Sequence, residues 1–334
     1  MKRVGNLYQQ IAEPDNLRLA FHKACKGKSD RRDVVLYRHR CSENLSLLRQ
    51  QLLDDSISVG DYRFFEVFDP KQRQICAAAF KERVLHHAIM NVCDPVLDRY
   101  AIYDSYACRL GKGQRKAVSR AQEFARCHPW YLKLDIRKYF DSIDHSILLD
   151  MLARRIKDRR LLVLFTQILD SYSTAPGKGL PIGNLVSQHL ANFYLGRLDH
   201  WLKDDLGTGC YLRYMDDFLV FGATRNQLNE LLAQIQRFLA EELQLTLKQN
   251  IQLNRCQLGI PFLGVRIAPG HIHLTRRSGE RFRHKLQQYE TQLLDGRWDE
   301  SQLVRHVLPL IEFTRGADAK ALRRKIIQDY GVAL

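Results

Sequence analysis

Two adjacent aspartates, Asp216 and Asp217, lie between two short apolar segments of the sequence. The flanking residues 211–213 and 218–221 have the pattern of paired strands, so we expect the aspartates at the tip of a buried β-hairpin. Carboxylates in such a place are costly to desolvate unless cations neutralise them. For an isolated pair of aspartates, a polar turn between two strands would be the better interpretation.

A third aspartate in a similar setting favours chemistry over a plain turn. Asp135 follows the strand-like segment that begins at Trp130. An acid at the exit of one strand and an acid pair on a neighbouring hairpin can converge on two Mg²⁺ ions, which activate a hydroxyl nucleophile and stabilise a leaving phosphate. We therefore predict a two-Mg²⁺ nucleotidyl transfer in which Asp135, Asp216 and Asp217 are both the catalytic and the metal-binding residues.

The elements that position these acids follow from the apolar pattern. Residues 1–60 have leucines at helical spacing and a glycine stop at Gly60, which predicts a helical start. Alternation predicts a strand over residues 62–68, a hairpin turn at Asp69-Pro70 and a second strand over residues 73–77. A helix is expected to begin near Phe80.

Beyond Asp135, the pattern predicts an amphipathic helix over residues 145–172, a Gly/Pro loop at 176–179 and a helix over 186–206. After the acidic hairpin we expect a helix over 225–243 and two short strands, at residues 244–247 and 261–267. The residues after 270 read as helical and basic. The predicted fold class is therefore α+β, with a helical start and a helical, basic end.

Composition indicates a folded protein that binds a polyanion. The 334 residues include 52 Lys and Arg against 37 Asp and Glu, which gives a formal net charge of +15 and a sequence pI near 9.5. The length fits two or three packed subdomains. Because the charge is dispersed rather than confined to a tail, the folded body is the expected binder. A basic protein that merely stays soluble is the plainer alternative.

The cysteines and the apolar runs indicate a cytoplasmic protein. The eight cysteines are scattered without a CxxC pair, which suggests neither a zinc site nor a disulfide framework. No apolar run approaches the length of a membrane span, and the basic N-terminus is not followed by the apolar stretch of a secretory signal. We therefore expect free thiols and no membrane partner.

A triphosphate substrate needs cations, and three candidates precede the acidic strand. Arg73, Lys81 and Arg83 lie on the predicted strand and helix ahead of Asp135. Taken singly, each could equally belong to an ordinary solvated face.

Two further positions lie near or between the acidic motifs. Phe140 follows Asp135 by five residues. Its plain interpretation is core packing, and its sharper one is a wall against the sugar that excludes a 2′-hydroxyl. Gly183 begins a helix after a loop and would let the backbone approach a base pair, while Ser187 or Gln188 could hydrogen-bond template or incoming nucleotide.

The order of these motifs resembles that of a reverse transcriptase. The five blocks are Arg73, residues 134–140, residues 183–188, residues 214–217 and Phe262-Leu263-Gly264. They are similar to the fingers and palm blocks of that family. The resemblance implies a right-hand polymerase fold, with a helical extension over residues 1–60, fingers over 61–130, a palm with finger insertions over 131–270 and a helical, basic thumb over 271–334.

The resemblance also implies an activity and residue roles. The activity is RNA-directed DNA polymerisation from dNTPs, with template RNA and primer as partners. Asp135 and Asp216 would be the principal Mg²⁺ ligands, with Asp217 as the third acid. Phe140 would be the sugar gate, and residues 262–264 would be the turn that grips the primer. The full nucleotide-binding set would be Arg73, Lys81, Arg83, Phe140, Ile182, Gly183 and Gln188.

One departure from the common pattern points to a subtype. Most reverse transcriptases carry Gln before the glycine and Ser-Pro after it, whereas this chain has Ile182 before Gly183 and Ser187-Gln188 after. That pattern resembles the enzymes of diversity-generating retroelements, which are related to group II intron-like bacterial enzymes. It implies error-prone cDNA synthesis, especially at adenines of a template-repeat RNA, for targeted gene diversification by mutagenic retrohoming. It also implies a small, basic, oligomeric accessory variability protein as a partner.

Two alternatives remain open from the sequence. A bacterial reverse transcriptase of phage defence would have the same active-site residues, and so would one of retron type, although the Asn-Ala-x-x-His block and the Val-Thr-Gly signature of retrons have no counterpart here. A catalytically inactive nucleic-acid-binding relative would be expected to lack at least one acid or the gate, and this chain retains all of them.

Overall fold

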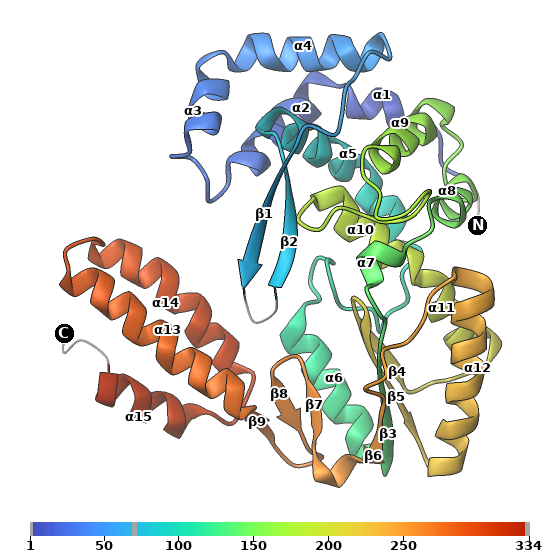
Figure 1. The fold of residues 1–334 in the computed structure, drawn as a ribbon, viewed down its shortest axis with the longest axis vertical. Helices are drawn as coiled ribbons and strands as arrows, with labels where there is room; N and C mark the ends of the chain where they lie inside the picture. Colours follow the sequence, from blue (N-terminus) through green and yellow to red (C-terminus); the bar gives the residue numbers. More distant parts are fainter. Residues whose placement is uncertain (1–2, 69–71, 331–334) are drawn as a thin grey trace. The chain divides into compact units, whose positions relative to one another are not determined.

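A computed structural model describes residues 3–68 and 72–330 (Figure 1). The chain forms two compact units, each assembled from separate stretches of sequence. The first contains the residues up to Tyr103 together with 136–207 and 235–248, and the second contains 104–135, 208–234 and the residues from Gln249 onward. Helices and antiparallel strands occur in both units, which confirms the predicted α+β class.

The first unit begins with the predicted helical segment. Its N-terminal helices are α1 (Leu7–Ile11), α2 (Pro14–Cys25), α3 (Arg32–His39) and α4 (Cys41–Leu53). Helix α2 packs along α5 (Phe80–Asp98) and buries Leu17 and Phe21 in the interface. The last of the four helices ends at Leu53, ahead of the predicted stop at Gly60.

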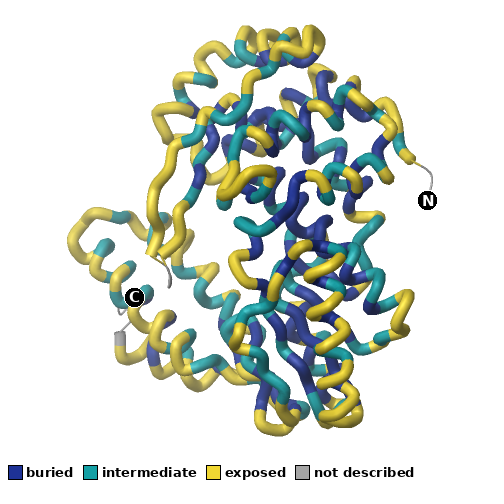
Figure 2. Tube along the Cα trace, turned by 45° about the vertical axis from the view of Figure 1, so that its right-hand side comes forward, coloured by how far each residue is buried: buried dark blue, intermediate teal, exposed yellow. Residues whose placement is uncertain are grey.

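A two-stranded hairpin connects these helices to α5. Strands β1 (Tyr62–Phe68) and β2 (Gln72–Ala78) pair antiparallel, from Tyr62 opposite Ala78 to Phe68 opposite Gln72. Both predicted strands are therefore confirmed, whereas the predicted turn at Asp69-Pro70 lies outside the described residues. Most of the hairpin is exposed (Figure 2).

The single helix predicted over residues 145–172 is wrong. The structure has two helices, α8 (His145–Ala153) and α9 (Arg159–Asp170), with an irregular connection between them. Val4 causes the interruption, because its amide donates to Arg155 O at 2.8 Å and its carbonyl accepts from Lys157 N at 2.7 Å. A backbone pairing with the distant N-terminus thus replaces the helical hydrogen bonds.

The helix predicted over residues 186–206 is present but segmented. It consists of α10 (Leu185–Tyr194), α11 (Gly196–His200) and a turn of π-helix over Trp201–Asp205. Gly196 stands at the first join, where a Cβ would lie 2.6 Å from the Tyr100 ring. Trp201 stacks on Phe238 with ring centroids 4.3 Å apart, which anchors the π-helical turn.

The second unit is built on a four-stranded antiparallel sheet. Its strands are β3 (Trp130–Asp135), β4 (Tyr211–Tyr214), β5 (Asp217–Gly222) and β6 (Gln252–Arg255), in the order β4-β5-β3-β6. The predicted strand ending at Asp135 and the predicted acidic hairpin are both confirmed. They are neighbours in the sheet, since β3 pairs with β5.

Of the two strands predicted after the acidic hairpin, the first is misplaced and the second is divided by a turn. Residues 244–247 form no strand and contribute only an isolated bridge from Leu247 to Ile136, while the fourth strand of the sheet lies later, in β6. Residues 261–267 form a hairpin, β7 (Ile260–Phe262) and β8 (Val265–Ile267), joined to β9 (Ile272–Leu274). The chain turns because Leu263 and Gly264 adopt positive φ angles of 48° and 83°.

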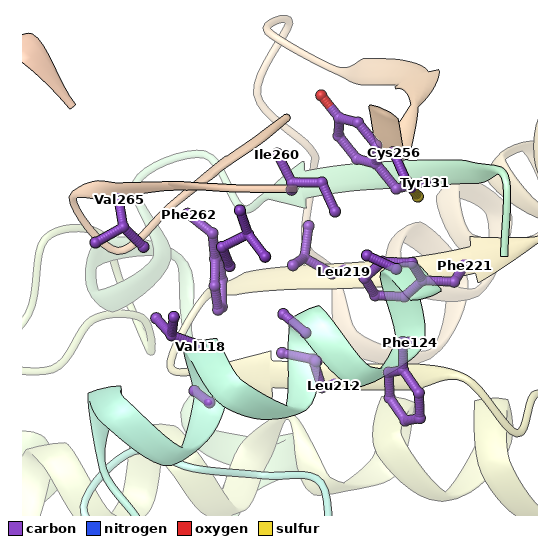
Figure 3. Close-up of a cluster of buried hydrophobic side chains, with 14 of the residues drawn as sticks. Val118, Phe124, Tyr131, Leu212, Leu219, Phe221, Cys256, Ile260, Phe262 and Val265 are labelled. Atoms are coloured by element: carbon purple, nitrogen blue, oxygen red, sulfur yellow. The ribbon is translucent and has the colours of Figure 1, made fainter. Parts of the chain in front are cut away.

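A helix absent from the sequence-based description covers this sheet. Helix α6 (Gln114–Cys127) packs on β4 and β5 and also meets β8 (Figure 1). Val118 and Phe124 of α6 join Leu212, Leu219 and Phe262 in one apolar core (Figure 3). Each fully buried side chain of this kind contributes about 1.5–3 kcal/mol, so the core holds the acidic strands firmly.

The C-terminal segment is helical, as predicted. It contains α13 (Arg276–Leu294), α14 (Glu300–Arg315) and α15 (Lys320–Tyr330), and Phe282, Leu286 and Ile326 form a small core of their own. Helix α12 (Arg225–Leu243) follows the acidic hairpin, again as predicted.

Within residues 3–68 and 72–330, no helix is long and apolar enough to cross a membrane.

Candidate active site

The sheet brings the three predicted acids to one end of its central strands. Asp135, the last residue of β3, lies directly opposite Asp217, the first residue of β5. Asp216 precedes it in the two-residue turn that joins Tyr214 to Asp217. The register is set by buried apolar residues that run along both strands up to the aspartates.

A buried arginine fixes the acidic turn. Met215, at the tip, has a left-handed φ of 56°, which is unfavourable for a residue with a side chain. The guanidinium of Arg213 donates to Met215 O at 2.9 Å and to Ser105 Oγ at 3.3 Å. Arg213 is fully buried, and hydrogen bonds to a charged donor are among the stronger ones in proteins. The turn is therefore held from inside the unit.

Asp217 is largely buried and is paired with a lysine. Its side chain is only 23% exposed, and Oδ2 lies 3.2 Å from the Nζ atom of Lys133. Burial raises the pKa of Asp217 to about 6, the ammonium of Lys133 opposes this rise, and the carboxylates of Asp135 and Asp216 add to it. Its second oxygen, Oδ1, is buried without a hydrogen-bond partner among the described residues.

The three carboxylates are suited to a divalent cation whose remaining ligands come from water and substrate. A buried, partnerless carboxylate oxygen beside two further carboxylates is a site that a cation would complete. Across the described part of the chain, no group of three or more His, Cys, Asp or Glu side chains could by itself hold a metal ion. Mg²⁺ usually takes only one or two protein carboxylates, together with water and substrate phosphates, so the incomplete set is compatible with it.

The three predicted triphosphate-binding cations lie in different surroundings. Arg73 on β2 and Lys81 on α5 are exposed. The Arg83 guanidinium instead donates to Ala24 O of α2 at 3.0 Å and lies over the Phe80 ring, 5.2 Å from its centroid. Arg83 therefore connects α5 to α2, whereas the side chains of Arg73 and Lys81 face solvent.

Phe140 lies in a single helical turn, α7 (Tyr139–Ser142), which follows β3 in the chain. Its neighbour Tyr139 is buried and donates its hydroxyl to Ala191 O. Phe140 is only half-buried, and its carbonyl accepts from Leu180 N at 2.7 Å. The backbone at this position is thus fixed, while part of the aromatic ring remains accessible.

The loop before α10 is attached to the β1–β2 hairpin. Ile182 O accepts from Cys76 N of β2 at 2.7 Å. Gly183 has a φ of +113°, and a Cβ there would lie 2.9 Å from the Ile75 side chain and 3.0 Å from Cys76 O. Glycine is therefore required for the close approach of two backbone segments of the chain, whereas the approach to a base pair predicted for Gly183 stays a prediction. Gln188 is partly exposed in the first turns of α10.

The predicted primer-contacting residues form the turn of the β7–β8 hairpin. Phe262 is buried in the core beneath the sheet, while Leu263 and Gly264 form the turn itself. Three neighbouring elements donate hydrogen bonds to carbonyls at this end of the hairpin: α6 through Gln114, β3 through Lys133 and the start of α13 through Ser278.

Two charged residues that support the site are absent from the sequence-based prediction. Lys133 contacts Asp217, and Arg213 supports the turn before it. A signal existed for both, because each interrupts an otherwise apolar strand. A charged side chain in a buried strand requires a charged or hydrogen-bonding partner.

The fold is that of a right-hand polymerase, as predicted. Among solved structures it is similar to apo telomerase from Candida tropicalis, with a TM-score of 0.52 and 12% sequence identity; the match covers 81% of this chain and 59% of that chain. A telomerase from the same organism in complex with a fragment of telomeric RNA matches with a TM-score of 0.51 and 11% identity, over 85% of this chain and 58% of that chain.

Sequence comparison identifies the family within that fold. The family model described as reverse transcriptase (RNA-dependent DNA polymerase) matches residues 69–267, more than half of the chain. The chain therefore belongs to the reverse transcriptase family.

Relatives include group II intron proteins. Protein YkfC of Escherichia coli is 22% identical over 319 residues, which cover 79% of this chain and 83% of that protein. The group II intron-encoded protein LtrA of Lactococcus lactis is 24% identical over 143 residues, which cover 40% of this chain and 23% of that protein. A putative COX1/OXI3 intron 1 protein of Saccharomyces cerevisiae is 22% identical over 176 residues, which cover 48% of this chain and 21% of that protein. The chain thus spans about a fifth of the last two proteins.

Proposed function

We propose that this chain copies RNA into DNA, and that Asp135, Asp216 and Asp217 are its catalytic acids. The observation that carries the proposal is the register of β3 and β5, which sets Asp135 opposite Asp217 beside the Arg213-supported turn. Membership of the reverse transcriptase family supports the same activity. Primer extension on an RNA template, with the parent compared with Asp216→Ala, tests it.

The cofactor proposed for these acids is Mg²⁺, with two ions taking part. Such ions would activate the primer hydroxyl and neutralise charge on the leaving pyrophosphate. The chain's own contribution is to hold Asp135 and Asp217 on paired strands and Asp216 in the adjoining turn, with Asp217 Oδ1 lacking a hydrogen-bond partner among the described residues. Arg73 and Lys81, both exposed cations, are proposed to bind the triphosphate of the incoming dNTP.

Phe140 is proposed as the gate that rejects ribonucleotides. Replacing it by alanine is expected to raise ribonucleotide incorporation relative to deoxynucleotide incorporation by about 10- to 200-fold, the range that a small steric difference supports. The ratio of kcat/KM for rNTP and dNTP, measured in single-nucleotide extension, checks this. Phe140→Tyr keeps the ring and should keep the parental ratio. An unchanged ratio in Phe140→Ala would assign the ring to packing alone.

We further propose that the polymerase is error-prone at template adenines and serves targeted diversification from a template-repeat RNA. Ile182 supports this, because it supplies no amide to read the geometry of the incoming nucleotide. Restoring an amide with Ile182→Gln is expected to lower misincorporation opposite adenine by about ten- to a hundredfold, equivalent to roughly 1–3 kcal/mol of discrimination. Sequencing cDNA made on one defined template measures the error spectrum.

The backbone contact at this position makes the Ile182→Gln test specific. Ile182 contacts β2 through its carbonyl, so exchange of the side chain leaves that hydrogen bond available. Ile182→Leu, which preserves volume and adds no polar group, is the matched control and should keep the parental spectrum. Identical spectra for parent and Ile182→Gln would contradict the proposed cause of the errors.

The same proposal includes a small, basic, oligomeric accessory protein and the template RNA as partners. Exposed leucines on the N-terminal helices offer a surface for a protein partner, among them Leu36 on α3 and Leu47 on α4, which are 60% and 56% exposed. Template RNA and primer are proposed to bind the basic surface, which carries the excess of 52 Lys and Arg over 37 Asp and Glu.

A further inference from the structure

The β7–β8 hairpin is held at carbonyls on both sides of its turn. Gln114 Nε2 donates to Leu263 O at 2.6 Å, and Ser278 Oγ donates to Gly264 O at 2.7 Å. The first of these donors begins α6 and the second lies in the first turn of α13. A Cβ at Gly264 would lie 2.9 Å from the Phe313 ring, so helix α14 also closes on the turn.

The third attachment of this hairpin comes from the strand that carries Asp135. Lys133 Nζ donates to Pro261 O at 2.9 Å and lies 5.9 Å from the centroid of the Phe262 ring. The same ammonium lies 3.2 Å from Asp217 Oδ2. Lysine has three donors on a flexible stem, so one side chain can hold a backbone carbonyl and a carboxylate together.

Both partners of this contact are sheltered from water. The Lys133 side chain is 19% exposed and that of Asp217 is 23% exposed. An ion pair in such a place is stronger than one on an open surface, and removing one partner leaves the other charge incompletely solvated. Lys133 therefore fixes Asp217 to the hairpin.

We propose that Lys133 is a positioning residue that sets the spacing between the Asp217 carboxylate and the β7–β8 hairpin. This inference rests on the proposed function, in which the hairpin contacts the primer and Asp217 belongs to the catalytic acids. The role assigned to Lys133 is to keep the distance between the primer end and the Asp217 carboxylate constant during nucleotide addition. A displacement of about 1 Å between reacting groups lowers rates by about a hundredfold.

Lys133→Met and Lys133→Arg test this role in the full chain. Methionine preserves much of the stem but removes both contacts, whereas a guanidinium can reach a carboxylate and a carbonyl at once. Arg266→Met is the matched control. Arg266 lies in the same unit and also donates hydrogen bonds to backbone carbonyls, those of Leu258 and Gly259 just before β7. Steady-state kcat and KM for dNTP, KM for primer–template and the melting temperature are measured for each variant.

The expected result is a split between kcat and KM. Lys133→Met should lower kcat by about 10- to 100-fold while KM for dNTP and for primer–template changes less than about threefold. Lys133→Arg should recover most of the rate, and Arg266→Met should keep parental kcat. The melting temperature of Lys133→Met is expected to fall, because Asp217 loses its partner, so kcat is compared at a temperature well below both melting temperatures, where a purely structural defect would leave the folded enzyme active.

Parental kcat in Lys133→Met would overturn the positioning role, and so would a loss of kcat matched by an equal loss in Arg266→Met. An active parent in either case leaves the proposed function intact. A parent without template-dependent extension would instead overturn the proposed function, and the inference with it.

Discussion

Asp216→Ala is expected to abolish RNA-templated primer extension, with kcat reduced by at least about 10³-fold, or about 4 kcal/mol in transition-state stabilisation. The physical reason is that the substitution removes a negative charge from the turn between β4 and β5, next to Asp217 on β5 and to the end of β3 that carries Asp135. Single-nucleotide extension with saturating dNTP and Mg²⁺ measures the loss. Chelation of the metal should reduce the parent to a similar rate.

Two further variants make this result specific. Asp216→Asn keeps the size of the side chain and removes its charge, so it should be nearly as inactive as the alanine variant. Asp170→Ala removes an exposed aspartate at the end of α9 and should keep the parental rate. The turn itself should survive in all variants, because the hydrogen bond from Arg213 goes to the backbone carbonyl of Met215, which every variant keeps. Parental kcat in Asp216→Ala would remove this residue from the catalytic set.

Affinity for primer–template is expected to fall by about 10³-fold when salt rises from 50 to 200 mM. This is the loss for about six phosphate contacts, since each Lys or Arg that binds a phosphate releases counterions. A formal net charge of +15 supplies the cations. Fluorescence anisotropy of a labelled primer–template, titrated at several salt concentrations, gives the slope of log Kd against log salt.

The helical C-terminal segment provides residues with which to locate these contacts. Arg277 and Arg283 on α13 are exposed, and replacing either by alanine should reduce the magnitude of the slope by about 0.7–0.9. Arg18→Ala is the control, because that arginine pairs with Asp15 in α2 and should not affect the slope. A response to salt that is flat for the parent would mean that the basic charge does not bind nucleic acid.

Local patterns were sufficient to predict the elements that carry the acids. Alternation of apolar residues located β1 and β2, and short apolar segments beside the acids located the β4–β5 hairpin and the end of β3 at Asp135. These elements are determined by residues adjacent in sequence. The positions of the three acids in these elements were predicted for the same reason, since a charge that ends an apolar strand is visible without a structure, while their catalytic role stays a prediction.

Long-range contacts explain what the sequence did not reveal. The break between α8 and α9 depends on Val4, about 150 residues away, and no periodicity records that pairing. Residues 244–247 have apolar residues at alternate positions, which led to the wrong prediction of a strand there. In the structure, Leu245 is buried, and its backbone amide donates a hydrogen bond to the carbonyl of Leu239 in α12. Lys133 escaped notice because its two partners come from different segments of the chain.

The fully buried guanidinium of Arg213 has a consequence for turnover. Ordering a flexible residue costs about 1–2 kcal/mol in conformational entropy, and Met215 and Asp216 would have to be ordered at each encounter if their turn were loose. The hydrogen bond from Arg213 to Met215 O orders the turn when the chain folds. The entropic cost of ordering the acidic turn is therefore met when the chain folds. Nucleotide binding does not have to order this turn, so its affinity is not reduced by that cost.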